Sequence, residues 1–145
     1  MAIQNSKPAP NRILYTMLRV KDLERSLEFY QSALGMYEMR RDTFPEGQFT
    51  LVFIGYGDAA SDAVIELTYN WGENKYDLGN AYAHLALEVD DVYEMEEHLK
   101  SLGVKIVRPA GSMSFAPQET GEKEIISFIE DPDGYRIEFI EKASD

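Results

Sequence analysis

The sequence predicts an α+β fold made of two similar halves, each with the order strand, helix and three strands. Residues 15–23 and 84–92 share one pattern of apolar and polar positions, and both segments end in Asp followed by an apolar residue. In each half a helical pattern follows and ends in Leu-Gly, at 34–35 and at 102–103. Such a repeat indicates two copies of one supersecondary unit.

Each half also has one glutamate inside a late, otherwise apolar strand, Glu66 in the first half and Glu138 in the second. The first residue of the repeat, Tyr15 or His84, precedes its glutamate by 51 positions in one half and by 54 in the other. If the halves pair about a pseudo-twofold axis, these four side chains converge. Imidazole and carboxylate groups bind divalent metal ions, so the duplication predicts a metal site.

The composition limits the classes of function. At 145 residues the chain fits one domain, which should bury roughly 68–70% of its unfolded surface. It has no cysteine, which excludes disulfides, thiolate ligands and thiol catalysis, and its formal net charge of −12 disfavours binding to nucleic acid or anionic membranes. No apolar run approaches the roughly 20 residues that span a bilayer, and no signal peptide is apparent, so we expect a cytoplasmic protein.

We expect a single domain of two modules joined by a polar linker, with a disordered N-terminal tail and a short C-terminal tail. The boundaries are 1–11 for the N-terminal tail, 12–141 for the domain, 12–70 and 82–141 for its modules, 71–81 for the linker and 142–145 for the C-terminal tail.

The strands are predicted from alternating polarity. Residues 12–19 alternate, which places Tyr15 and Arg19 on one face of the first strand. The turn signal Asp-Pro-Asp-Gly at 131–134 joins the last two strands. The other strands are expected at about 36–42, 48–55 and 63–70 in the first half, and from His84 onward and at about 104–108, 123–130 and 135–141 in the second.

The helices are predicted from caps and apolar stripes. Asp22 and Asp91 can each accept a hydrogen bond from the first helical turn, and Glu94 makes the second start an acidic variant of the capping box. Gly35 and Gly103 can adopt the left-handed conformation that ends a helix. The stripes are Leu23, Leu27, Tyr30 and Leu34, and Val92, Met95, Leu99 and Leu102.

The candidate ligands also have less specific interpretations. A glutamate within a strand usually lies on a solvated face, and a lone histidine on an apolar strand is more often structural than a ligand. Their recurrence at matched spacing favours the ligand role for Glu66, His84 and Glu138. The second histidine, His98, lies among charged residues of the second helix, so we expect it to be exposed and inert.

Several segments resemble bacterial glyoxalase I, a lactoylglutathione lyase family of the vicinal-oxygen-chelate superfamily. The resemblance covers about residues 12–141, and its most specific part is AVIELTYNWG at 63–72. It implies two paired βαβββ modules in a mixed, curved eight-stranded sheet, and a homodimer with active sites at the subunit interface. The other matching segments are TMLRV at 16–20, SLEFY at 26–30, LGM at 34–36, FIGYG at 53–57, DLG at 77–79, AYAHLAL at 81–87 and EDPDGYRIE at 130–138.

Position by position, the resemblance implies Tyr15, Glu66, His84 and Glu138 as metal ligands. The implied metal is Ni²⁺ or Co²⁺ in preference to Zn²⁺. The implied reaction, which detoxifies methylglyoxal, isomerises the methylglyoxal-glutathione hemithioacetal to S-D-lactoylglutathione through an enediolate. In that reaction Glu138 is the leading base, and Glu66 is a second carboxylate that can move protons.

Tyr15 departs from the family pattern, which has His or Gln at this position. A phenol ligates well mainly as a phenolate, so we expect weaker metal binding. An alternative interpretation is a catalytically impaired homologue that binds a small molecule. Extradiol dioxygenases and fosfomycin-modifying enzymes need two histidines and fit less well, and the segment 63–72 argues against an epimerase of coenzyme A thioesters.

The resemblance also implies contacts to the substrate. Arg19 and Asn70 match the residues that bind the γ-glutamyl end of glutathione, where a guanidinium can pair with a carboxylate. The basic signature that usually meets the glycyl end is absent from residues 110–124, and Lys123 is the candidate to replace it.

Overall fold

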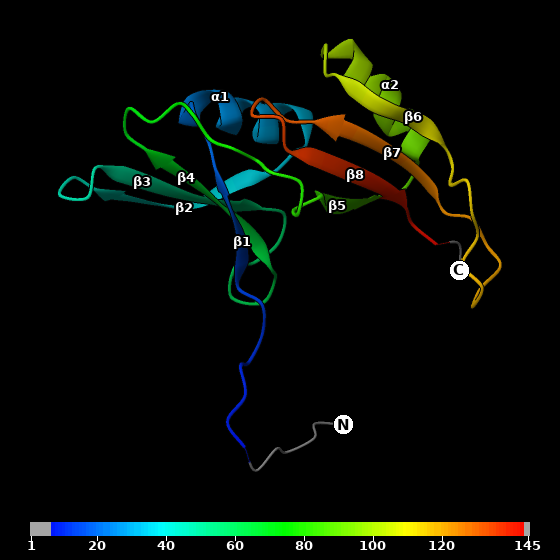
Figure 1. Ribbon diagram of the computed structural model, residues 1–145, viewed down its shortest axis with the longest axis horizontal. Helices are drawn as coiled ribbons and strands as arrows, with labels where there is room; N and C mark the ends of the chain where they lie inside the picture. The colour runs from blue at the N-terminus through cyan, green and yellow to red at the C-terminus, as the bar shows by residue number, and fades with distance from the viewer. Residues whose placement is uncertain (1–6, 144–145) are drawn as a thin grey trace.

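The computed structural model describes residues 7–143, so residues 1–6 and 144–145 of the two predicted tails lie outside it. The order of elements is strand, helix and three strands, twice, as predicted (Figure 1). None of the helices in the described part of the chain is long and apolar enough to cross a membrane. The elements are β1 (Tyr15–Arg19), α1 (Leu23–Glu28), η1 (Phe29–Ala33), β2 (Tyr37–Phe44), β3 (Phe49–Gly55), β4 (Val64–Asn70), β5 (His84–Val89), α2 (Val92–Ser101), β6 (Ile106–Ser112), β7 (Ile125–Glu130) and β8 (Arg136–Glu141).

The strands form two four-stranded sheets of identical topology. Their orders are β1-β4-β3-β2 and β5-β8-β7-β6. β1 pairs in parallel with β4, and β5 pairs in parallel with β8. The other neighbouring strands are antiparallel. The eight strands of the predicted mixed sheet are therefore present as two hydrogen-bonded groups of four that lie side by side (Figure 1).

The predicted helix caps are confirmed. The carboxylate of Asp22 accepts a hydrogen bond from the Arg25 amide, and that of Asp91 accepts one from the Glu94 amide at 3.0 Å. The helices end at glycines with positive φ, +69° at Gly35 and +75° at Gly103, where a side chain would be strained.

Two details of the helices differ from the prediction. The last turn of the first helix is the wider π-helical segment η1, and in this turn Tyr30 and Ala33 are both buried, as is Leu34 just after it. In the second helix, the expected stripe residue Leu102 lies just past the helix end and is 49% exposed. His98 is exposed, as predicted.

The strand β6 begins two residues later than predicted and extends four residues further. Two register shifts interrupt its pairing with β7, and such bulges obscure the polarity alternation on which the prediction depended. Arg108 stabilises the irregular stretch, because its guanidinium donates hydrogen bonds to carbonyl oxygens nearby. Those carbonyls belong to Pro109, Gly111, Ser112 and Ile126.

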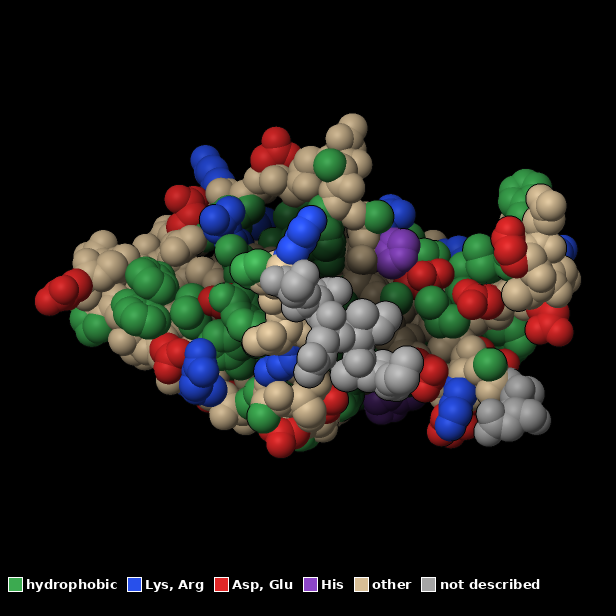
Figure 2. Space-filling view, turned by 90° about the horizontal axis from the view of Figure 1, so that it is seen from below, with side chains coloured by type: hydrophobic (Ala, Val, Ile, Leu, Met, Phe, Trp, Pro, Cys, Tyr) green, Lys and Arg blue, Asp and Glu red, His purple; other side chains and the backbone are tan. Residues whose placement is uncertain are grey.

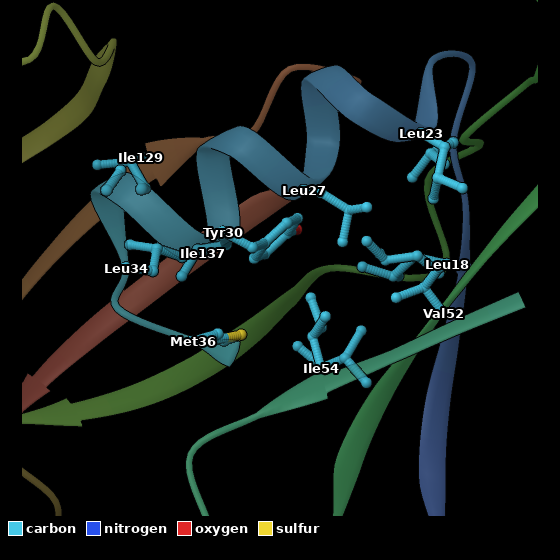
Figure 3. Packing of buried hydrophobic residues seen from close by; sticks show 14 of the residues in the cluster. Leu18, Leu23, Leu27, Tyr30, Leu34, Met36, Val52, Ile54, Ile129 and Ile137 are labelled. Carbon is cyan, nitrogen blue, oxygen red and sulfur yellow. The ribbon is translucent and has the colours of Figure 1, made fainter. Parts of the chain in front are cut away.

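The helix formed by α1 and η1 packs against both sheets (Figure 3). Its apolar stripe faces buried residues of the first sheet, and its C-terminal end lies beside buried residues of the second. Burying one such side chain stabilises the fold by roughly 1.5–3 kcal/mol, so this shared core holds the two modules together. The labelled residues are Leu23, Leu27, Tyr30 and Leu34 from the helix, Leu18, Val52, Ile54 and Met36 around the first sheet, and Ile129 and Ile137 from the second.

A polar clamp adds to this core. The turn Asp131–Gly134 between β7 and β8 bonds to the first module, and this fixes where β8 begins. The hydrogen bonds run from the Lys21 amide to Asp133 Oδ1 at 3.0 Å, from the Ser26 hydroxyl to Asp133 Oδ2 at 3.2 Å, from the Tyr30 hydroxyl to Asp131 Oδ2 at 2.7 Å, and from the Tyr135 hydroxyl to the Arg19 carbonyl at 2.7 Å.

Candidate metal and substrate site

The candidate ligands occupy equivalent positions in the two sheets. Tyr15 on β1 pairs with the residue two positions before Glu66 on β4. In the same way, His84 on β5 pairs with Arg136, two positions before Glu138 on β8. Residues two apart on a strand share a face, so each pair lies together on the face that its helix leaves uncovered. The duplication indicated by the repeat is thus present in the strand register.

The pair in the second module is in direct contact. His84 Nε2 lies 3.1 Å from Glu138 Oε1, and the two side chains are 34% and 12% exposed. The imidazole ring also meets the ring of Phe128 edge to face, with 5.0 Å between centroids. One nitrogen and one carboxylate therefore converge beside an apolar wall, as a ligand pair requires.

The pair in the first module has a different environment. Glu66 is only 6% exposed, and across the sheet it faces Met17 and Phe53. The one hydrogen bond found for its carboxylate among the described residues comes from the Thr68 hydroxyl, at 3.5 Å. A buried carboxylate with so weak a partner is not a solvated surface residue, so the less specific interpretation fails for Glu66.

Tyr15 stands at the rim of this first module. Its side chain is 44% exposed, and its ring meets Phe53 edge to face at 5.3 Å. The guanidinium of Arg40 covers the same Phe53 ring at 4.3 Å, a cation–π arrangement. A pocket of about 370 Å³ lies between Tyr15, Phe53 and Arg40.

The two pairs do not meet within one chain. Across residues 7–143 no three His, Asp or Glu side chains lie close enough to hold one ion, so Glu66 does not join His84 and Glu138. The open face of the first sheet is instead rich in apolar side chains, which Figure 2 shows in the view from below. The convergence expected from the sequence is therefore absent within residues 7–143 of one chain. We call the two separate candidate pairs half-sites.

The substrate candidates of the first module are brought together. Arg19 lines a small pocket of about 150 Å³ with Tyr76 and Asp77. The Asn70 amide donates a hydrogen bond to the Tyr76 hydroxyl at 3.1 Å, which links Asn70 to this pocket. Sequence reasoning missed Tyr76 and Asp77, because the linker that holds them has no periodic pattern.

A larger pocket of about 510 Å³ adjoins the second module. Its walls include His84, Phe128 and Arg136, together with Tyr82 from the end of the linker. Burial raises the pKa of Tyr82, and it also raises the pKa of Tyr135, so both phenols stay neutral near pH 7. The sequence signal for Arg136, which was missed, is its place two residues before Glu138.

Lys123, the predicted contact to the glycyl end, lies away from the pair in the second module. It precedes β7, whose first residues pair with the end of β8 near Ile140, whereas His84 pairs with the start of β8. Within one chain the structure therefore does not bring Lys123 to His84 and Glu138.

Two copies of a βαβββ unit, each with a candidate ligand pair on its open face, define the class as a duplicated-module α+β protein. The chain belongs to the Glyoxalase/Bleomycin resistance protein/Dioxygenase superfamily, whose family model matches residues 12–139.

Two similar proteins are named as lactoylglutathione lyases. The lactoylglutathione lyase of Neisseria meningitidis is 55% identical over 133 residues, 92% of this chain and 92% of the relative. That of Haemophilus influenzae is 50% identical over 133 residues, 92% of this chain and 94% of the relative.

Two solved structures agree with this grouping. Glyoxalase I from Leishmania major, described as trypanothione-dependent, is 41% identical with a TM-score of 0.76, over 91% of this chain and 87% of the other. Glyoxalase I from Zea mays is 39% identical with a TM-score of 0.81 and matches 92% of this chain, which spans only 45% of the maize chain.

Proposed function

We propose that this chain is a lactoylglutathione lyase, which isomerises the hemithioacetal of methylglyoxal and glutathione to S-D-lactoylglutathione. The observation that carries the proposal is the His84–Glu138 contact on the open face of the second sheet. Tyr15 and Glu66 occupy the equivalent register positions in the first sheet. Relatives at about 50% identity over most of the chain have this activity in their names. A catalytically impaired binding homologue is not favoured, because such decay would not be expected to leave Glu66 buried, Glu138 largely buried and both at equivalent register positions.

The donor set fits a divalent metal ion. His84 offers an imidazole nitrogen, Glu66 and Glu138 offer carboxylate oxygens, and Tyr15 offers a phenol oxygen. Nitrogen and oxygen donors of this kind suit Ni²⁺ and Co²⁺, which we propose in preference to Zn²⁺. When bound, the ion would act as a Lewis acid toward the negative charge that develops on the two vicinal oxygens of the substrate.

The proton transfers fall to the carboxylates. Glu138 would take the proton from the carbon next to the sulfur and return it to the neighbouring carbon. Its side chain is mostly buried, contacts His84 and lies opposite Phe128 in the strand register, which holds the carboxylate in a defined position. Glu66 would serve as the second mobile carboxylate, and His84 as the fixed ligand.

We further propose a homodimer in which Tyr15 and Glu66 of one protomer face His84 and Glu138 of the other. The separation of the pairs within one chain supports this arrangement, because a complete site then needs two chains. Large apolar side chains near Tyr15 are also exposed, which is typical of an interface. They are Ile13 (73%), Leu14 (56%) and Met17 (40%).

The substrate end groups match the charges of the smaller pocket. Arg19 can pair with the carboxylate of the γ-glutamyl end, and Asp77 in the same pocket can pair with its ammonium group. Lys123 stays a candidate for the glycyl end. The cytoplasmic location and the domain boundaries also stay predictions.

The test is the formation of S-lactoylglutathione from methylglyoxal and glutathione by metal-stripped protein refilled separately with Ni²⁺, Co²⁺ or Zn²⁺. Metal-dependent turnover would support the proposal and identify the preferred ion. Folded protein with no turnover under any of the three metals would contradict it and favour the binding homologue.

A further inference from the structure

We propose that Arg136 binds a carboxylate of the glutathione portion of the substrate and so determines specificity for this thiol. The proposal rests on the proposed function. Arg136 opens β8, shares the uncovered face with Glu138, and pairs in register with His84. It lines the pocket of about 510 Å³ together with His84 and Phe128. Arg136 is thus the neighbour of a candidate metal ligand on the adjacent strand, and both residues line the same pocket.

The charge of Arg136 is available to a ligand. Among the described residues no acidic side chain lies within ion-pair distance of it, although Glu130 stands opposite it in register on β7. Glu130 Oε2 is instead engaged by Lys105 Nζ, at 3.3 Å. The side chains that line the pocket include no Asp or Glu.

The chemistry of this pocket fits a carboxylate. The planar guanidinium can donate two parallel hydrogen bonds to it, and the aromatic walls would strengthen the pair by excluding water. A chain of net charge −12 repels an anionic substrate unless cations are placed locally. Glutathione has two carboxylates. The proposed pairing with Arg19 uses only one of them, and Lys123 lies near the end of β8 that is far from His84. A second cation near His84 is therefore needed.

The test is calorimetric binding of S-methylglutathione, which cannot react, to the Ni²⁺-loaded protein at verified metal content. We expect Arg136→Gln to weaken binding by roughly tenfold or more, and Arg136→Lys to restore part of the loss. Two further ligands tell the carboxylates apart. The glycyl ethyl ester of S-methylglutathione lacks a free glycyl carboxylate. S-methylcysteinylglycine lacks the γ-glutamyl group and its carboxylate. The ligand that lacks the partner of Arg136 should bind wild type and Arg136→Gln equally.

Lys142→Gln is the matched control, because it removes the same charge from the exposed residue just beyond the other end of β8. The proposal is overturned if Arg136→Gln weakens binding no more than Lys142→Gln does, or weakens all three ligands by the same factor. Turnover is measured separately. Arg136-dependent binding without turnover would reject the lyase assignment and leave Arg136 as a carboxylate site.

Discussion

At the scale of single residues, the contact between His84 and Glu138 makes Glu138 the residue on which turnover should depend most. Glu138→Gln keeps the size of the side chain and removes its ability to accept a proton. We expect turnover with Ni²⁺ to fall by roughly 10²- to 10⁴-fold, measured as initial rates of S-lactoylglutathione formation.

Glu88→Gln is the matched control, because Glu88 lies exposed on the neighbouring strand β5. It should leave the rate unchanged, and both variants should melt as cooperatively as wild type. Normal turnover by Glu138→Gln would remove Glu138 from the role of base.

Tyr15 allows a second prediction at this scale. A histidine there would offer a neutral imidazole in place of a phenol, at a rim position where Tyr15 is already 44% exposed and free to be replaced without opening the core. We expect Tyr15→His to tighten Ni²⁺ binding on the order of tenfold in a chelator competition, and to raise turnover with added nickel.

Tyr93→His is its control, because Tyr93 is exposed on α2, away from the half-sites. If Tyr15→His leaves the nickel affinity of the protein unchanged, the phenol is already a sufficient ligand or this position does not reach the metal.

At the scale of elements, the turn before β8 controls how the modules are joined. Asp133 has a side chain only 2% exposed, and it accepts hydrogen bonds from the Lys21 amide and the Ser26 hydroxyl. Asp133→Ala leaves both donors without their partner, and we expect it to lower the free energy of unfolding by about 2–4 kcal/mol. Urea denaturation measures the change, with exposed Asp90→Ala as the control. A loss below about 0.5 kcal/mol, the size of an ordinary surface substitution, would show that the clamp contributes little.

The neighbouring Asp131 gives this clamp a pH dependence. Burial raises the pKa of its carboxyl above the ordinary 3.8, although hydrogen bonds from Tyr30 and from backbone amides oppose the rise. Between the unfolded and folded pKa values the folded state therefore binds more protons. The stability that Asp131 contributes through this raised pKa is complete below its unfolded pKa, and it is lost as pH rises through its folded pKa.

The measurement is the difference in unfolding free energy between wild type and Asp131→Asn, followed upward from about pH 3, which lies below the ordinary pKa of Asp. We expect wild type to lose stability relative to the variant as pH rises. Glu38 supplies the opposite sign, because its hydrogen bond with Arg41 lowers its pKa. The same difference for Glu38→Gln should shrink as pH falls. If the unfolding free energy of wild type instead rises relative to that of Asp131→Asn as pH rises, the pKa of Asp131 is lowered by folding and not raised.

At the scale of the whole molecule, the features that the sequence predicted well are those encoded within a short stretch. The caps at Asp22 and Asp91 and the helix ends at Gly35 and Gly103 depend on local backbone geometry, so their positions could be read directly. The predicted equivalence of the two candidate ligand pairs is also present, because both modules use the same strand register.

Features that depend on contacts between distant segments could not be predicted. Nothing periodic in the chain indicates that Tyr76 binds Asn70, or that Asp133 caps the first module from a turn more than 100 residues away. The bulges of β6 likewise disturbed the alternation that locates a strand. The alternation of β8 places Arg136 on the face of Glu138, but the sequence does not show the pocket that Arg136 lines with His84 and Phe128.

The separation of the half-sites within one chain leads to the prediction that tests the whole assembly. If each site takes Glu66 from one protomer and Glu138 from the other, a mixed dimer of Glu66→Gln and Glu138→Gln chains contains one doubly substituted site and one intact site. Two variants that are inactive alone should therefore recover activity when they are unfolded together and refolded.

With random pairing of equal amounts, half of the dimers are mixed and half of their sites are intact, so about a quarter of wild-type activity should return. The matched control is a mixture of wild type with the Glu66→Gln, Glu138→Gln double variant, whose mixed dimers have no intact site. Sites contained within one chain would predict the reverse: no recovery in the first mixture, and no loss of wild-type activity on mixing in the second.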